Sequence, residues 1–194
     1  MNERMWAVDI EGNGKTPPEI VEIAIVELRG LERTGLRRNW RLRPPSGIAP
    51  MASRIHGIWD RDVADAPDLE DVADDILVWL EGAPIVGHNV RVELEVLGRA
   101  LDEWSPASAY DTLKLARAML PDAPKHGLEA LGARLGLDVQ AASETGSTAH
   151  SALYDATLSA ILLKYLLQPL SAEERRRRLA EIDLLEPPPQ GQLI

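Results

Sequence analysis

The chain has 194 residues, no cysteine and a formal net charge of −10, and 45% of its residues are hydrophobic. This length is sufficient for one domain with a substantial core, and the absence of cysteine excludes disulfides, thiolate metal sites and cysteine nucleophiles. The acidic balance argues against a protein that coats nucleic acid through bulk charge, but not against an enzyme that grips a few nucleotides while metal ions offset its acids.

Three strands are predicted near the start of the chain. Residues 5–11 form a short apolar run, residues 19–29 are rich in β-branched side chains, and residues 35–43 alternate between apolar and polar. The Pro-Pro-Ser-Gly sequence at 44–47 then ends the third strand. Because short links join these strands, we expect an antiparallel meander at the start of a mixed sheet.

Helical spacing of apolar residues begins after residue 65. The predicted elements are a helix over 69–80, a strand over 84–87, helices over 90–101, 111–120, 126–135 and 151–167, and a last helix that begins at a capping box, Ser171 to Glu174. Strands followed by strand–helix alternation predict a three-layer α/β domain over residues 1–170. Residues 171–194 are expected to form a C-terminal helix and, after three prolines at 187–189, a loose tail.

Two acids stand out in the first strand. Asp9 and Glu11 are two residues apart, so both side chains project from one face of the strand. Like charges held together on an apolar strand repel each other, and a bound cation would offset that repulsion. Taken alone, the pair is equally consistent with a solvated face of an edge strand.

Two later segments combine acids with histidines. In the first, His88 and Asn89 follow a strand and lead into a helix that carries Glu93. In the second, His150 precedes Asp155 at the start of the long helix. Each segment has an ordinary explanation by itself, since His150 would usually be a surface or capping histidine and His88-Asn89 a polar turn.

The order and spacing of these three segments resemble the DEDD exonuclease superfamily, and specifically its His-containing branch. That branch places a histidine five residues before the last aspartate, as His150 and Asp155 are here. The sister branch has a tyrosine four residues before that aspartate, where this chain has Ser151. The resemblance covers residues 5–167 and is greatest to the epsilon proofreading subunits of bacterial DNA polymerase and to the exonuclease X group. It implies an RNase H-like fold with a mixed five-stranded sheet flanked by helices.

The resemblance also implies a site for two Mg²⁺ ions, which Mn²⁺ can replace, because these hard cations prefer oxygen ligands. Asp9 would bridge the two ions, and Glu11 and Asp155 would complete one of them. Glu93 would support the second ion directly or through water. His150 would act as the general base, since an imidazole has an ordinary pKa of about 6.5.

Five further residues are expected on the substrate side of this site: Gly12, Asn13, His56, His88 and Asn89. For His56 a packing role is at least as well supported. Two departures from the family pattern bear on the site. The family usually has aspartate where this chain has Glu93, and it commonly has threonines after Glu11, where this chain has Gly12-Asn13-Gly14. The longer side chain of Glu93 would loosen the second metal, favour the larger Mn²⁺ or have no effect.

The function predicted from this resemblance is metal-dependent 3′→5′ exonuclease activity on single-stranded DNA or RNA ends or short oligonucleotides, with release of nucleoside 5′-monophosphates. The alternatives are a catalytically weakened nucleic-acid-binding module and a polymerase-associated proofreading module. Residues 190–194 distantly resemble a sliding-clamp peptide, and a homodimer is left open. The N-terminus lacks a secretion signal and no apolar run approaches a membrane span, so we expect a cytoplasmic protein without membrane contact.

Overall fold

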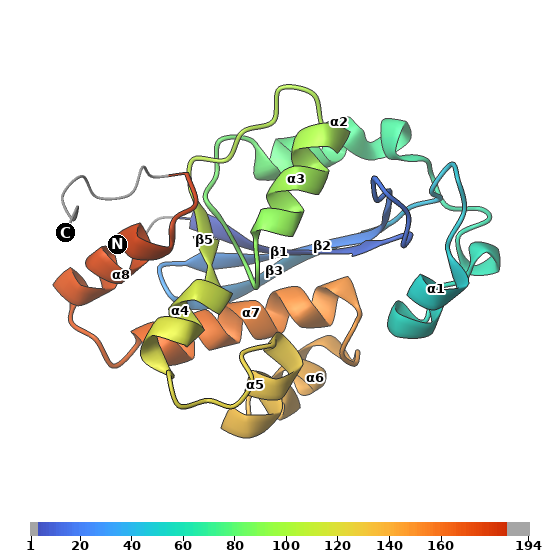
Figure 1. Cartoon of the computed structure of the whole chain (residues 1–194). Coiled ribbons are helices and arrows are strands. Elements are labelled where there is room, and N and C mark those ends of the chain that lie inside the picture. Colours follow the sequence, from blue (N-terminus) through green and yellow to red (C-terminus); the bar gives the residue numbers. More distant parts are fainter. Residues whose placement is uncertain (1–3, 186–194) are drawn as a thin grey trace, which may run out of the picture.

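The computed structural model describes residues 4–185 and contains one five-stranded sheet with the strand order β3-β2-β1-β4-β5 (Figure 1). The meander predicted from the sequence consists of β1 (Arg4–Gly12), β2 (Ile20–Arg29) and β3 (Glu32–Arg41), which pair antiparallel. Two short strands, β4 (Ile85–Gly87) and β5 (Ala109–Asp111), extend the sheet in parallel. The predicted mixed five-stranded sheet is confirmed.

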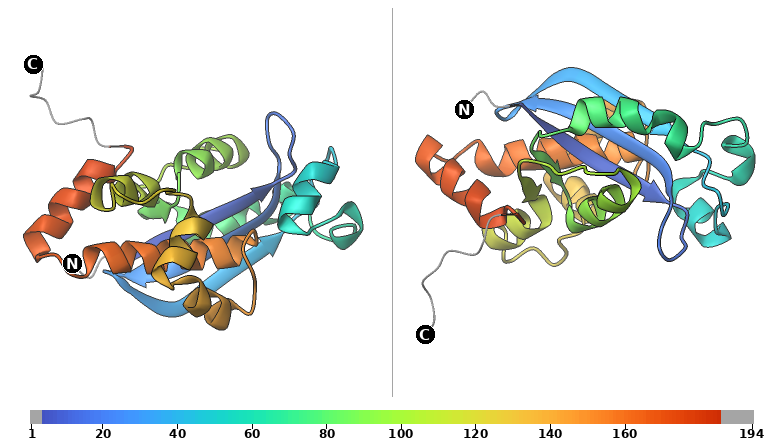
Figure 2. Two further views of the ribbon diagram at one scale, coloured as in Figure 1. Left: turned by 60° about the horizontal axis from the view of Figure 1, so that its bottom comes forward. Right: turned by 90° about the horizontal axis from the view of Figure 1, so that it is seen from above.

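Helices cover both faces of the sheet (Figures 1 and 2). On one face lie α2 (Leu69–Leu80) and α3 (Arg91–Ala100), and on the other lies the long α7 (Ala152–Leu167). Three short helices pack around α7: α4 (Thr112–Met119), α5 (Leu128–Leu135) and α6 (Asp138–Thr145). The two remaining helices lie beyond opposite ends of the sheet: α1 (Pro50–His56) and α8 (Ala172–Ile182).

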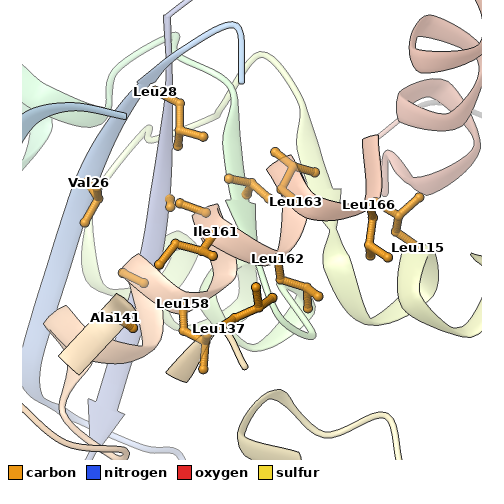
Figure 3. Packing of buried hydrophobic residues seen from close by; sticks show 14 of the residues in the cluster. Val26, Leu28, Leu115, Leu137, Ala141, Leu158, Ile161, Leu162, Leu163 and Leu166 are labelled. Atoms are coloured by element: carbon orange, nitrogen blue, oxygen red, sulfur yellow. The ribbon is translucent and has the colours of Figure 1, made fainter. Parts of the chain in front are cut away.

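The core is divided by the alternation of side chains along β1. Met5 and Ala7 belong to the apolar cluster built around α7, whereas Trp6 and Val8 belong to the cluster that contains the buried residues of α2 and α3. Figure 3 shows the first cluster, in which α7 packs on β2 and on the short helices through the following residues: Val26, Leu28, Leu115, Leu137, Ala141, Leu158, Ile161, Leu162, Leu163 and Leu166. The helical layers on both faces of the sheet therefore pack against side chains of β1.

Three elements were not predicted from the sequence. A single helix was expected over 111–120, but β5 precedes α4, and Asp111 both ends the strand and caps the helix by accepting the N–H of Leu113 at 2.8 Å. The pattern of a three-residue strand is too short to detect. Helix α6 buries little more than Ala141, and α1 has only seven residues, so neither shows a clear apolar period.

The C-terminal helix begins where its capping box was predicted. The Ser171 hydroxyl accepts the N–H of Glu174, and the Glu174 carboxylate accepts the N–H of Ser171 at 2.9 Å. Leu179 and Ile182 of α8 pack into the α7 cluster. The expected tail after residue 187 and the peptide at 190–194 lie outside the described residues. Within the described part of the chain, no helix is long and apolar enough to cross a membrane.

The loop after β1 is tied to α1 by a close backbone approach. The Asn13 carbonyl accepts the N–H of Ala49 at 2.9 Å. Gly14 has a φ of 75°, and a β-carbon at this position would lie 2.9 Å from Cβ of Ala52 and 3.2 Å from Cβ of Ala49. Glycine satisfies both the left-handed backbone and the contact. This contact holds α1, which ends at His56, beside the end of β1.

Gly14→Ala is expected to lower the free energy of unfolding by about 2–5 kcal/mol. The left-handed backbone contributes roughly 1–2 kcal/mol, and the clash with α1 adds about 1–3 kcal/mol. Gly35→Ala is the matched control, because Gly35 has a φ of 87° and a β-carbon there would meet nothing within 4 Å. Urea unfolding should show a loss of only about 1–2 kcal/mol for this control. Equal losses in the two variants would contradict the close approach to α1.

Candidate metal centre

Asp9 and Glu11 lie at the open end of β1. The pairing of β1 with β4 ends at Ala7 and Val86, so β1 extends beyond its parallel neighbour from Asp9 onward. By strand alternation, Asp9 and Glu11 face the same side as Ala7, toward α7. Both side chains are half-buried. The predicted pair is therefore no solvated edge face but part of the boundary between the sheet and α7.

Glu93 reaches the same end of β1 from α3. A β-carbon on Gly87, the last residue of β4, would lie 3.2 Å from the carbonyl oxygen of Val8, so a side chain there would crowd β1. Asn89 then adopts a φ of 73°, and its N–H donates to Oδ1 of Asp111 at 3.1 Å. This turn starts α3 and places Glu93 in its first turn, where the side chain is buried.

Asp155 and His150 come from the start of α7. The helix is capped by Ser151, whose hydroxyl accepts the N–H of Tyr154 at 3.4 Å. His150 lies just before the cap with a φ of 62°, and its backbone N–H donates to Oδ2 of Asp155 at 3.1 Å. One potential ligand atom from each of Glu11, His150 and Asp155 lies within 4.8 Å of the others.

The pKa values of the acids at this site are raised, first by burial and then by neighbouring negative charges. We call the four acids at this end of β1 the carboxylate cluster: Asp9, Glu11, Glu93 and Asp155. Burial, and then the charges of the other three, raises the pKa of Asp9 well above its ordinary value. Burial and the charge of Asp155 raise the pKa of Glu11 to about 7. Burial raises the pKa of Glu93 to about 8, and that of Asp155 to about 6 despite the opposing effect of His150.

The carboxylate cluster fits hard divalent cations. Oε2 of Glu93 is buried and has no hydrogen-bond partner among the described residues. A buried acceptor without a partner costs about 1–3 kcal/mol, and coordination of a cation would remove that cost. Mg²⁺ and Mn²⁺ prefer such oxygen ligands. Their charge would also offset the repulsion within the cluster.

Two residues expected on the substrate side have their polar groups engaged within the protein. The fully buried Asn13 side chain donates to Glu19 at 3.0 Å and accepts the N–H of Glu19 at 3.1 Å. Nδ1 of His88 lies 2.9 Å from the hydroxyl of Thr112, and its Nε2 lies 2.7 Å from the carbonyl oxygen of His126. Both side chains hold loops around the site together.

The other three residues expected on the substrate side are Gly12, His56 and Asn89. Gly12 directly follows Glu11 at the end of β1. His56 accepts the N–H of Ile58 on Nδ1 at 3.1 Å, and its Nε2 is buried. Burial lowers the pKa of His56, and the neighbouring backbone of Gly12 partly opposes this. Asn89 uses its backbone, as described above, to start α3.

Three acids near the site were not predicted from the sequence. Glu22, opposite Glu11 on β2, is 2% exposed. Asp111 caps α4, and Oε2 of Glu129 lies 3.9 Å from Nε2 of His150. The signal for Glu22 was an acid inside an apolar strand, and the signal for Asp111 was an aspartate directly before a helix. No sequence signal marks Glu129.

Comparisons with known proteins agree with this arrangement. A sequence model of the family described as Exonuclease matches residues 7–163. DNA polymerase III subunit epsilon of Haemophilus influenzae is 33% identical over 148 residues, and that of Escherichia coli is 31% identical over 150 residues. Each alignment covers 73% of this chain, and the chain spans 56% and 59% of the length of these two relatives.

Solved structures share the fold. Exonuclease X in complex with 5′-overhanging duplex DNA matches with a TM-score of 0.71 and 31% identity, over 91% of this chain and 98% of that one. Exonuclease I of Escherichia coli in complex with an oligonucleotide matches with a TM-score of 0.70 and 17% identity, over 91% of this chain and 43% of that one, and this likeness concerns the fold alone. The RNase H-like fold predicted from the resemblance is confirmed.

Without metal, the protein is expected to become less stable as the pH rises from about 5 to about 8. The pKa values of about 6 for Asp155, about 7 for Glu11 and about 8 for Glu93 lie above the ordinary values. The folded protein therefore binds more protons than the unfolded chain in this window, and their loss on raising the pH lowers the free energy of unfolding. Melting temperatures in EDTA measure this, and Mn²⁺ should raise them most at about pH 8.

Glu93→Gln should flatten the upper half of this pH dependence, because it removes a group whose pKa is about 8. Glu27→Gln is the matched control, since Glu27 is also buried, but its pKa is lowered, chiefly by a hydrogen bond from Thr34. Above pH 6, the melting temperature of Glu27→Gln should change with pH as steeply as that of the wild type. If the melting temperatures of wild type and Glu93→Gln change equally with pH, the raised pKa of Glu93 is contradicted.

Proposed function

The chain belongs to the exonuclease family, and from this premise we propose that it is a metal-dependent 3′→5′ exonuclease acting on single-stranded or overhanging DNA ends. It would release nucleoside 5′-monophosphates one at a time. The observation that carries the proposal is the convergence of the carboxylate cluster from three separate elements, with one buried oxygen of Glu93 left without a partner. We restrict the proposal to hydrolysis and do not extend it to polymerase association.

The carboxylate cluster would hold two divalent ions, Mg²⁺ or Mn²⁺. Asp9 would be a ligand at the centre of the cluster, because the charges of the other three acids all act on it. Glu11 and Asp155 would complete one ion, and Glu93 would support the other. When bound, such ions lower the pKa of water and stabilise the charge that develops on the attacking and leaving oxygens of a phosphodiester.

His150 would act as the general base. Its side chain is 49% exposed and lies at the rim of the carboxylate cluster, where it can reach both bulk water and the scissile phosphate. It would accept the proton of the attacking water as the new phosphorus–oxygen bond forms, and the departing 3′ oxygen would take up a proton from solvent. Glu129, 3.9 Å from the ring, would favour the imidazolium that results.

The proposed substrate is a DNA end that the protein grips locally. Exonuclease X, the solved relative at 31% identity over nearly its whole length, is bound to 5′-overhanging duplex DNA, a substrate with a recessed 3′ end. A net charge of −10 disfavours a long contact with the phosphate backbone. Recognition would therefore depend on the metal ions and on groups beside the cluster, such as the backbone of Gly12 and the ring of His56.

His150→Ala is expected to lower kcat about 10²–10⁴-fold with little change in KM, the usual effect of losing a general base. Matched DNA and RNA oligonucleotides, labelled at the 5′ end, should be digested with Mg²⁺ or Mn²⁺ and the products resolved by length. Wild type should shorten the DNA stepwise from its 3′ end and prefer it to the RNA. His126→Ala is the matched control, since the His126 ring hydrogen-bonds to the carbonyl oxygen of Leu120 at 2.9 Å.

Three results of the same digest would contradict the proposal. Intact oligonucleotides that still bind the wild-type protein would favour the catalytically weakened binding module. Equal activity of His150→Ala and wild type would remove His150 from the mechanism, and faster digestion of RNA would reverse the proposed preference.

Glu93→Asp tests whether the longer side chain sets the metal preference. We expect wild type to hydrolyse DNA faster with Mn²⁺ than with Mg²⁺. Glu93→Asp should lower the ratio of the Mn²⁺ rate to the Mg²⁺ rate severalfold, because the shorter side chain would hold the smaller Mg²⁺ less loosely. Initial rates over a series of Mg²⁺ and Mn²⁺ concentrations measure the ratio. Glu95→Asp is the matched control on the same helix. An unchanged ratio in Glu93→Asp would show that the extra methylene has no effect.

A further inference from the structure

Glu22 is a fifth buried acid beside the carboxylate cluster. It pairs with Glu11 in the register of β1 and β2, so its side chain projects from the same face of the sheet toward α7. Its neighbours two and four residues along β2, Ala24 and Val26, pack in the α7 cluster on that face. An acid that is 2% exposed at this position requires polar partners.

Both carboxylate oxygens of Glu22 have such partners. Oε1 accepts hydrogen bonds from Asn39 at 3.2 Å and from Arg41 at 3.1 Å, both on β3. Oε2 accepts the backbone N–H of Ala152, the first residue of α7, at 3.0 Å. One side chain thus joins two strands to the N-terminus of the helix that carries Asp155, where a negative charge also interacts favourably with the helix dipole.

A directional contact at the N-terminal end of α7 is required to fix the position of the helix along its axis. Twelve of its sixteen residues are buried, and most of these are leucine, isoleucine or alanine. Apolar contacts of this kind depend weakly on the exact position of a helix along its axis, and each residue advances the helix by about 1.5 Å. A hydrogen bond from Ala152 to the sheet fixes that position, and Asp155 lies in the same first turn of the helix.

We infer that Glu22 is a positioning residue: by accepting the N–H of Ala152 it fixes α7 along its axis and holds Asp155 against Glu11 and Asp9. The inference deepens the proposed function and rests on it for its catalytic consequence. Displacement of a reacting group by about 1 Å can lower a rate about 10²-fold. Glu22 itself is no catalytic residue, because its oxygens are occupied by Asn39, Arg41 and Ala152.

Ala152→Pro tests this, and because Ala152 is fully buried while Ala172 is exposed, the melting temperatures of both variants are measured alongside their activities. Proline is favourable at the first position of a helix and removes only the N–H that Glu22 accepts. The preceding residue, Ser151, already has the extended backbone that proline requires, with φ −115° and ψ 135°. Ala172→Pro is the matched control, because α8 also begins with a Ser-Ala pair whose serine is extended. Both substitutions place a proline after a capping serine, but only one breaks the contact with Glu22.

The expected result for Ala152→Pro is a loss of kcat of about tenfold or more with KM within about threefold, while Ala172→Pro keeps wild-type values. A second readout is independent of turnover: Mn²⁺ binding by calorimetry should weaken about tenfold in Ala152→Pro and not in Ala172→Pro. Glu22→Gln retains one oxygen that can accept the N–H of Ala152, so it should recover most of the activity lost in Glu22→Ala.

Glu27→Ala controls for the removal of a buried carboxylate from β2. Glu27 is 3% exposed, lies opposite Trp6 on the other face of the sheet and pairs with Arg4 at 3.0 Å. Glu22→Ala should lose far more kcat than Glu27→Ala at a comparable loss of melting temperature. Equal kcat and equal Mn²⁺ affinity in Ala152→Pro and Ala172→Pro would overturn the inference. If wild type fails to hydrolyse DNA while Mn²⁺ binding still weakens only in Ala152→Pro, the proposed function fails and the positioning role stands.

Discussion

Four carboxylates converge at the open end of β1, and their mutual repulsion opposes the fold that brings them together. Burial is the largest cause of the raised pKa values of Glu11, Glu93 and Asp155, which reach about 7, 8 and 6, and neighbouring negative charges add to it. Such an arrangement persists only if the surrounding structure is rigid enough to hold it. This repulsion lowers the stability of the metal-free protein, and the proposed divalent cations would remove that cost on binding.

The surrounding structure supplies this rigidity through a second set of acids. Glu22 and Asp111 are also buried, yet their oxygens accept backbone N–H groups, from Ala152 at 3.0 Å and from Asn89 at 3.1 Å. These bonds hold the first turns of α7 and α3, the two helices that deliver Asp155 and Glu93. Hydrogen bonds thus satisfy Glu22 and Asp111, which support the site, whereas the buried Oε2 of Glu93 has no hydrogen-bond partner within the described residues.

The sequence was most informative where pattern and chemistry coincide. Asp9 and Glu11 share a strand face, and the distance from His150 to Asp155 distinguishes one branch of a family from another, so five residues from distant segments could be placed at one site. Asn13 and His88 were interpreted less well, because their chemical type does not reveal that tertiary partners occupy their polar groups. Glu22 escaped prediction for a related reason: its partner is a backbone N–H 130 residues away in the sequence.

The central claim is that the carboxylate cluster binds two cations side by side. Electron paramagnetic resonance of the protein titrated with Mn²⁺ at about pH 8 tests it directly, since ions held roughly 3.5–4 Å apart couple magnetically. We expect two Mn²⁺ per chain with a coupled spectrum, and loss of the coupling in Asp9→Asn, which removes the bridging ligand. A single uncoupled ion in wild type, or a wild-type spectrum retained in Asp9→Asn, would contradict the account.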